Sequence, residues 1–335
     1  MSSYHARTEG FVIDLSTARW AFPGTDEAYA QYCQARKILP VSETLDDGTK
    51  AHWIGSKGSK NVMLYFHGTT HKQTNSLKMS LTLALGGGYN VSANPEHYFF
   101  LSDILSFING DTPSKLSILL LSYDTAPYAT YPRQLEQGVA LLNHTLHTLN
   151  YAPEHILLGG DSAGGNLTLG ILSHILHPHP RSSDLPKLEL QGPLKGACLI
   201  SPWVDFNTST DSYTRNAWKD AIPVEALHRW SSLFLGKASP DPYNTPLSAP
   251  KGWWGGLSGV VKDVFVCGGS DEVLIDDIEK MVKVLREQWE GEGRLEYELV
   301  NDECHDSILC DRLIGYKTPP PKMDAVVRKW LHERI

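Results

Sequence analysis

The sequence predicts an α/β protein whose mainly parallel central sheet is flanked by helices. Short apolar runs typical of buried strands alternate along the chain with longer amphipathic patterns typical of helices. One apolar run ends in Gly160-Asp161-Ser162-Ala163-Gly164, and an apolar helical pattern begins directly after it. Strands that alternate with helices favour a parallel sheet with right-handed crossovers. Reactive side chains are then expected at the carboxyl ends of the strands.

The expected elements follow in a regular order. A short amphipathic helix over 24–39 precedes the first strand and is expected in a lid. The run over 61–66 is apolar enough to be buried on both faces, and Pro132 is well placed to open a helix. Strands are expected over 51–54, 61–66, 117–121, from Ile156, over 197–200, 264–267 and 295–300; further helices from Pro132, after Ser162, over 224–235 and 272–289, and around 323–331.

The alternation stops between Asp205 and Gly259. This stretch contains one helical pattern, four tryptophans and several prolines, and a linker would not carry four tryptophans. We therefore expect an insertion that covers the sheet. The predicted organisation is an N-terminal cap segment over 1–50, a core over 51–204, a cap insertion over 205–259, and the rest of the core over 260–335.

Composition narrows the classes of partner. Lys and Arg number 30 against 38 Asp and Glu, which gives a net charge of −8 with no basic run. Neither nucleic acid nor an anionic membrane surface is expected as a partner, and a neutral or apolar small molecule is favoured. The five cysteines form no C-x-x-C pair, which indicates reduced thiols. The first residues lack the apolar region of a signal peptide and no segment approaches 18 apolar residues, so we expect a cytoplasmic protein.

Ser162 has the setting of a nucleophile elbow. In this motif glycines stand two residues before and two after the serine, because neighbouring chains approach too closely for side chains. Gly160 and Gly164 satisfy the requirement. A plain Gly/Ser turn is the alternative, but a strand ahead and a helix behind favour the elbow. The elbow needs no metal, the histidines lack the paired spacing of a metal site, and no cofactor is expected.

A serine nucleophile needs a histidine, and the histidine needs a carboxylate. The chain order of such elbow enzymes is serine, acid, histidine. Asp271 follows the strand over 264–267 and His305 follows the strand over 295–300, so we predict a triad of Ser162, Asp271 and His305. The rival acids are Glu272, Asp276 and Asp277, expected as first-turn helix charges, and Glu303 and Asp306, which flank His305 and could orient it but are expected in solvent.

Six stretches together resemble the hormone-sensitive-lipase-like group of α/β-hydrolases. They are 160–166 (GDSAGGN), 123–127 (YDTAP), 201–205 (SPWVD), 241–247 (DPYNTPL), 269–272 (GSDE) and 304–306 (CHD). The resemblance implies an α/β-hydrolase fold with a helical cap and a carboxylic-ester hydrolase that acts on a small-molecule ester. It is similar to fungal members above all, some of which act in secondary metabolism.

One motif departs from the group. Its members carry His-Gly-Gly-Gly after a strand, where backbone N–H groups stabilise the oxyanion. Here His67-Gly68 is followed by Thr69, and a glycine run appears only at 86–88. Removal of the 18 residues 69–86 restores the motif, so we hypothesise an in-frame retained intron of 54 nucleotides. The rival is a genuine loop with Leu77, Leu81 and Leu85 in a lid helix.

The oxyanion donors follow from that choice. Ala163, directly after the nucleophile, is expected to donate in either case. The second donors are Gly87 and Gly88 if the segment 69–86 loops out, or Gly68 and Thr69 if it does not. Loss of one such donor typically costs about 100- to 1,000-fold in turnover.

The predicted function is hydrolysis of a short-acyl or apolar ester through an acyl-enzyme. The tryptophan- and tyrosine-rich cap predicts an apolar pocket for a short acyl chain or a ring-bearing ester. Two alternatives stay open. A biosynthetic acyl-transfer, thioester-releasing or eliminating enzyme would keep the same triad, and a non-catalytic ligand receptor would bind without turnover.

Overall fold

An eight-stranded sheet forms the centre of the molecule, in the order β1-β2-β4-β3-β5-β6-β7-β8. β2 pairs antiparallel with β1 and with β4, and all other neighbouring strands are parallel. The computed structural model describes residues 23–68, 87–112, 114–181, 185–313, 315 and 320–335. The strands are β1 (Ser42–Thr44), β2 (Lys50–Ile54), β3 (Asn61–Phe66), β4 (Leu116–Ser122), β5 (Ile156–Asp161), β6 (Leu194–Ile200), β7 (Val261–Gly269) and β8 (Arg294–Val300). The predicted mainly parallel sheet is confirmed.

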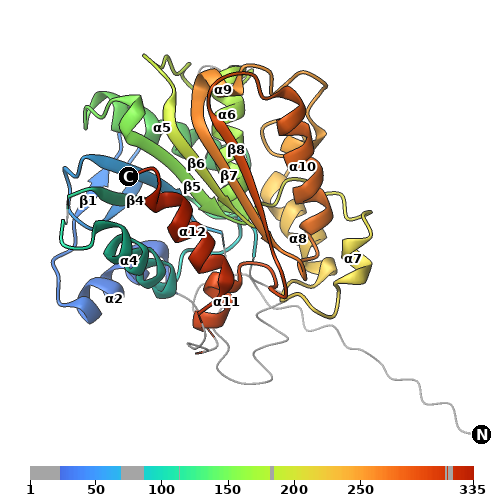
Figure 1. Ribbon diagram of the computed structural model, residues 1–335, viewed down its shortest axis with the longest axis horizontal. Helices are drawn as coiled ribbons and strands as arrows, with labels where there is room; N and C mark the ends of the chain where they lie inside the picture. The colour runs from blue at the N-terminus through green and yellow to red at the C-terminus, as the bar shows by residue number, and fades with distance from the viewer. Residues whose placement is uncertain (1–22, 69–86, 113, 182–184, 314, 316–319) are drawn as a thin grey trace, which may run out of the picture.

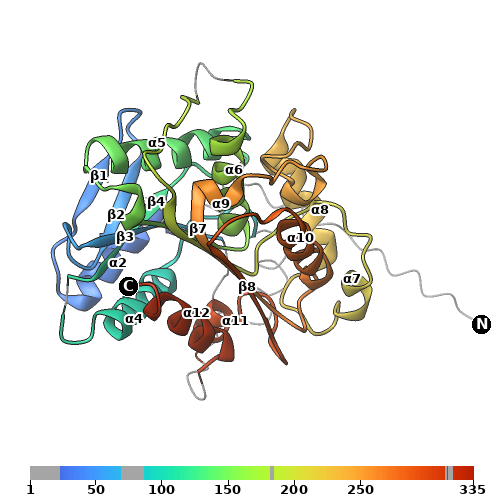
Figure 2. The same cartoon turned by 45° about the horizontal axis from the view of Figure 1, so that its top comes forward.

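Helices cover both faces of the sheet, as Figures 1 and 2 show. One face carries α2 (Thr25–Arg36), α4 (Pro95–Asn109), α11 (Ser307–Leu313) and α12 (Lys322–His332); the other carries α5 (Arg133–His147), α6 (Ala163–Leu176), α9 (Leu257–Val260) and α10 (Ile275–Gln288). Successive residues of a strand point to opposite faces. Leu64 of β3 accordingly packs in one apolar core, and Met63 and Tyr65 pack in the other.

The structure differs from the sequence prediction in three elements. β1 lies inside the stretch predicted as an N-terminal cap and extends the sheet by pairing with β2. α2, expected in a lid, packs against α4 and β2 on one face of the sheet. α4 was not predicted, although Pro95 at its first turn and buried Phe100, Leu101 and Ile104 are the ordinary signals of an amphipathic helix.

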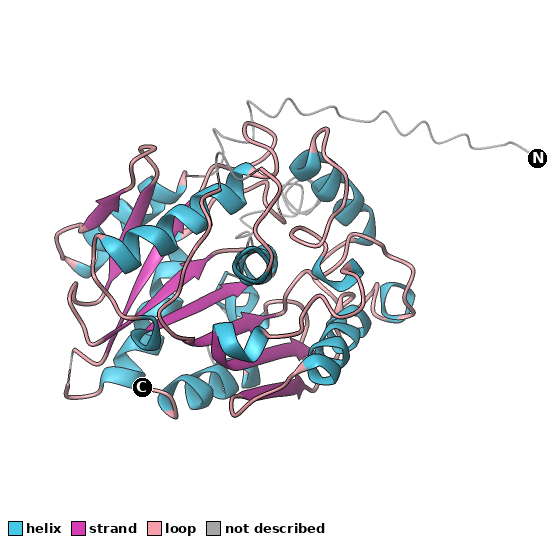
Figure 3. Cartoon of the chain, turned by 90° about the horizontal axis from the view of Figure 1, so that it is seen from above, coloured by secondary structure: helices cyan, strands magenta, loops and turns pink. Residues whose placement is uncertain are grey.

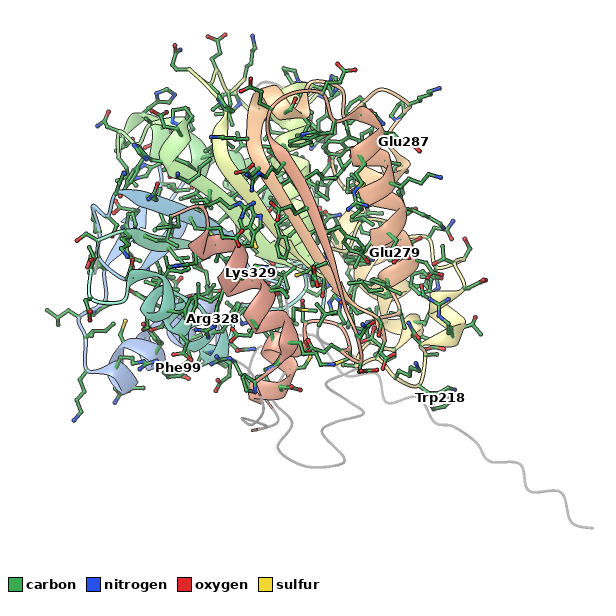
Figure 4. All side chains as sticks on the ribbon, in the orientation of Figure 1. Phe99, Trp218, Glu279, Glu287, Arg328 and Lys329 are labelled. Atoms are coloured by element: carbon green, nitrogen blue, oxygen red, sulfur yellow. The ribbon has the colours of Figure 1, made fainter. Side chains whose placement is uncertain are left out.

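The segment 205–259 forms no strand and contributes α7 (Ser212–Arg215), α8 (Val224–Leu235), the short η2 (Pro246–Ser248) and α9. Trp230 and Trp254 are buried in the core that covers one face of the sheet. Trp218 differs, since its side chain is 99% exposed and projects from the loop after α7 (Figure 4). The segment therefore packs on the core as an insertion does, although its exact boundaries stay a prediction.

The strand register places the site. Phe66 at the end of β3 pairs with Gly160 of β5, and Asp161 pairs with Ile200 at the end of β6. Gly269 of β7 pairs with Val300 of β8. The loops that follow these strands therefore leave the sheet at one edge, beside each other. Figure 3 shows the strands from above, with helices on both sides of the sheet. Within the described part of the chain, no helix is long and apolar enough to cross a membrane.

Candidate active site

Ser162 stands on a strained turn between β5 and α6. Its φ of 50° and ψ of −114° lie outside the regions that side-chain-bearing residues normally adopt. A methyl group on Gly160 would lie 2.4 Å from the carbonyl carbon of Gly164, and one on Gly164 would lie 1.8 Å from the carbonyl oxygen of Phe66. Both glycines are therefore required by close backbone approach, which confirms the reason for reading this turn as an elbow.

His305 and Glu272 form a buried imidazole–carboxylate pair. His305 follows β8 and Glu272 follows β7, and Nδ1 of the imidazole lies 3.1 Å from Oε2 of the carboxylate. The other oxygen, Oε1, accepts hydrogen bonds from the Ser201 hydroxyl at 2.6 Å and from the backbone N–H of Gly269. His305 is 2% exposed and Glu272 is not exposed at all. The carboxylate is thus fixed on both oxygens and holds one nitrogen of the imidazole.

The prediction that Asp271 orients His305 is corrected by this geometry. The Asp271 carboxylate lies 2.8 Å from the Lys219 ammonium group and is partly exposed. Its neighbour Glu272 points to the interior instead, because α10 begins only at Ile275 and leaves Glu272 in the preceding turn. The expectation that Glu272 is a first-turn helix charge is therefore also wrong.

The second nitrogen of His305 faces another carboxylate. Nε2 lies 3.2 Å from Oδ2 of Asp306, but no described residue forms a hydrogen bond of ordinary geometry with it, Ser162 included. Burial opposes a charge on His305, yet the carboxylates of Asp306 and Glu272 outweigh burial and raise the pKa of the imidazole well above its usual value. Asp306 is fully buried, contrary to the solvated role expected from the sequence.

Asp220, in the insertion, braces the same turn. Its Oδ1 accepts a hydrogen bond from the backbone N–H of His305 at 2.9 Å, and its Oδ2 accepts one from Val273 at 2.6 Å. Burial raises the pKa of the Asp220 carboxyl to about 6. One side chain therefore ties the loop of His305 to the turn that carries Glu272. Nothing in the sequence singled it out, because an acid inside an irregular segment has no local pattern.

One of the predicted oxyanion donors already has a hydrogen-bond partner. The backbone N–H of Gly68 donates to Oδ2 of Asp161 at 2.8 Å, so this group is already engaged. Thr69 and the rest of the segment 69–86 lie outside the described residues. The alternative pair of Gly68 and Thr69 therefore loses its first member as a donor.

Gly87 and Gly88 each pack closely against the side chain of a tryptophan. A methyl group on Gly87 would lie 2.1 Å from Cη2 of Trp230, and one on Gly88 would lie 2.8 Å from Cζ3 of Trp203. Gly88 also has a φ of +59°, which favours glycine. The backbone N–H of Trp203 donates to the carbonyl oxygen of Ser162 at 3.0 Å. Gly88 thus packs against Trp203, whose backbone is hydrogen-bonded to the turn of Ser162.

A second tie joins the glycine pair to the elbow helix. The Tyr89 hydroxyl donates to Oδ1 of Asn166 at 2.7 Å, and Nδ2 of Asn166 donates to the carbonyl oxygens of Trp203 and Asn244. All these groups are buried. Asn166 lies one turn after Ser162, so Tyr89, the residue after the glycines, is anchored close to the turn of Ser162. The structure describes no group of three or more His, Cys, Asp and Glu side chains, among the residues it covers, that is arranged to hold a metal ion.

Fold and site together define an α/β protein with an elbow serine at the strand ends, next to a buried imidazole–carboxylate pair. The chain belongs to the alpha/beta hydrolase fold family, whose model matches residues 87–309. The predicted α/β-hydrolase fold and family are thereby confirmed. The match begins at Gly87, directly after the segment 69–86.

Individual relatives are distant. The chain is 23% identical over 222 residues to steryl acetyl hydrolase 1 of Saccharomyces cerevisiae, which covers 62% of this chain and 48% of the yeast protein. This chain spans about half the length of the first curated relatives that it matches. A solved esterase/lipase from an uncultured bacterium has a TM-score of 0.67 at 24% identity and covers 98% of this chain and 94% of its own. A solved esterase from the bacterial hormone-sensitive lipase family has a TM-score of 0.63 at 24% identity, with 96% of each chain covered.

Proposed function

We propose that this protein is a serine hydrolase of carboxylic esters, with Ser162 as nucleophile, His305 as general base and Glu272 as the carboxylate that orients the base. The observation that carries the proposal is the 3.1 Å contact between His305 Nδ1 and Glu272 Oε2 at the same sheet edge as the elbow serine. Chain order is serine, acid, histidine, as in other elbow hydrolases. Glu272 takes the role assigned to Asp271 from the sequence.

The chemistry follows from the two nitrogens of His305. Glu272 fixes the proton on Nδ1, so that Nε2 is the basic nitrogen and takes the hydroxyl proton as Ser162 attacks the acyl carbonyl. The resulting imidazolium returns this proton to the leaving alkoxide, and water then releases the acyl group by the same steps. The backbone N–H of Ala163, the first residue of α6, has no partner within its helix and supports the oxyanion. Gly87 and Gly88 are the proposed further donors.

The proposed substrate is an ester with a short acyl group. Support comes from two buried aromatic side chains, Trp203 and Trp230, which lie next to the glycine pair. They make the space around these glycines apolar and narrow. The yeast relative is named a steryl acetyl hydrolase, and that name fits the same class. A role in fungal secondary metabolism stays a prediction from the resemblance alone.

Hydrolysis of p-nitrophenyl acetate and butyrate by three purified proteins tests the proposal. The full chain, Ser162→Ala and a variant that lacks 69–86 are compared at equal concentration, with circular dichroism as the check of folding. We expect Ser162→Ala to lose at least about 1,000-fold in turnover. The deletion variant should be at least as active as the full chain if its glycines come together after His67.

Other outcomes would redirect the proposal. Tight binding of an ester without turnover in all folded proteins would indicate a receptor and contradict hydrolysis. Transfer of the acyl group to an added alcohol or thiol, with little free acid, would indicate a biosynthetic acyl-transfer enzyme on the same residues. Full activity in Ser162→Ala would show that the elbow serine is not the nucleophile.

A further inference from the structure

We propose that Asp306 is a positioning residue of the general base: its carboxylate lies against the Nε2 side of His305 while Glu272 holds the Nδ1 side. The two contacts are 3.2 Å and 3.1 Å long, so the imidazole lies between two carboxylates. An ordinary catalytic triad has one carboxylate beside the imidazole. The proposal rests on the proposed function for its kinetic test, but its first readout is the imidazole itself.

A purely structural role does not account for Asp306. The residue precedes α11, where an aspartate usually accepts hydrogen bonds from the first backbone N–H groups of the helix. Instead both carboxylate oxygens are fully buried and neither has a hydrogen bond of ordinary geometry. Its φ of +47° is also costly for a residue other than glycine, although aspartate and asparagine tolerate it best. A buried acid without a structural partner, beside Nε2, requires a functional explanation.

Carboxyl groups and neutral tyrosine and cysteine side chains surround the pair. The titratable groups that face His305 and Asp306 come from five other elements: Tyr65 of β3, Asp161 at the end of β5, Cys267 of β7, Glu272, Asp220 of the insertion, and Cys310 of α11. No arginine or lysine is among these neighbours of the pair. His305 is the cation that contacts Asp306 in the described part of the chain, and the charge of each favours that of the other.

This arrangement has opposite effects in two stages of the reaction. Burial raises the pKa of the Asp306 carboxyl to about 7. Where it is ionised in the resting enzyme, the Asp306 carboxylate stabilises the protonated imidazole, which cannot accept the proton of Ser162. During attack the imidazole becomes an imidazolium, and the same carboxylate stabilises the transition state. Because its contact with Nε2 is not aligned as a hydrogen bond, that nitrogen can turn to Ser162 without breaking one. Asp306 should thus restrict activity to higher pH and strengthen the base there.

Asp306→Asn separates these effects. Asparagine has the same shape, tolerates the positive φ and removes the charge. Removal of an opposite charge at this distance should lower the pKa of His305 by about one unit or more. The first measurement is the pKa of His305 from the Cε1–H resonance in protein labelled at histidine, assigned with His305→Gln. Asp306→Gly, which also fits the backbone, is a second variant in case the asparagine does not fold.

The matched control is Asp302→Asn. Asp302 also has a positive φ, of 62°, and lies three residues before His305, but its carboxylate faces Lys322 and is 87% exposed. We expect the His305 pKa to fall in Asp306→Asn and to stay unchanged in Asp302→Asn. An equal pKa in the wild type, Asp306→Asn and Asp306→Gly would overturn the proposal, whether or not the protein hydrolyses esters.

The pH profile of kcat/KM gives the second readout. In Asp306→Asn the acidic limb should move to lower pH by about the same one unit, and the alkaline plateau should fall by about threefold because the base is weaker. The wild-type and variant profiles should therefore cross. A uniform loss at every pH would show a merely structural role and contradict the proposal. A lowered His305 pKa in a protein that hydrolyses no ester would support the role of Asp306 and refute the proposed function instead.

Discussion

Glu272, and not its neighbour Asp271, contacts the imidazole of His305, at 3.1 Å between Oε2 and Nδ1. The two acids are adjacent, yet one is buried in the site and the other pairs with Lys219 at the surface. This difference decides which carboxylate the proposed mechanism uses. Substitutions of Glu272 and Asp271 can therefore be compared directly to test the assignment.

Glu272→Gln should lower kcat by at least about 100-fold, because a neutral amide can favour the wrong tautomer of His305. Asp271→Asn should stay within about threefold of the wild type, because an exposed ion pair contributes little. Both are measured with the same p-nitrophenyl ester, and thermal unfolding checks the fold. A larger loss in Asp271→Asn than in Glu272→Gln would restore the assignment made from the sequence.

The wild-type enzyme should need neutral or alkaline conditions. His305 must be unprotonated to accept the Ser162 proton, and the carboxylates around it raise its pKa above the usual 6.5. Activity should therefore rise with pH, and the acidic limb of kcat/KM should have its midpoint above 6.5. A midpoint near pH 5 would contradict this prediction, because it would mean that the two carboxylates do not raise the pKa of His305.

Gly87→Ala should damage the site through a defined clash. The added methyl group would overlap Cη2 of Trp230, and an overpacked core typically loses about 1–3 kcal/mol. Trp230→Phe removes the clashing atom, so the double variant should recover part of the activity that Gly87→Ala loses. If Trp230→Phe gives no recovery, the loss arises from the backbone of Gly87 and not from contact with the indole.

Tyr89→Phe should weaken the tie between the glycine pair and the elbow helix. It removes one buried hydrogen bond to Asn166 and should lower the free energy of unfolding by about 1 kcal/mol, measured in urea. Tyr297→Phe is the control, since its hydroxyl donates to Glu279 at the surface, and it should change stability by less than about 0.5 kcal/mol. Equal effects of the two substitutions would mean that the buried hydrogen bond of Tyr89 contributes no more to the free energy of unfolding than a surface contact.

Most of the sheet and the strand–turn–helix that carries Ser162 could be predicted from the sequence. β3, β5 and β7 are apolar runs that end in distinctive residues, and the elbow directly follows β5. The local sequence pattern is therefore sufficient to place all four. The identity of the acid could not be predicted, because Asp271 and Glu272 follow the same strand. Only the turn conformation decides which of the two faces inward.

The remaining positions depend on contacts between distant segments. Asp220 reaches His305 across 85 positions of the chain, and Tyr89 reaches Asn166 across 77. Asp306 was expected in solvent because aspartate usually is, and its burial follows from the packing of the loop before α11. The pairing of β1 with β2 was missed for another reason, since three residues are too few for a periodic signal.

The most direct test of the central claim is to map the covalent adduct of a fluorophosphonate, which reacts with an activated serine whatever the natural ester is. The proposed mechanism predicts one adduct per chain, located on Ser162 by peptide mass spectrometry, absent in Ser162→Ala and formed much more slowly in His305→Gln and Glu272→Gln. An adduct on another residue, or equal rates in the wild type and His305→Gln, would contradict a nucleophile at Ser162 activated by His305.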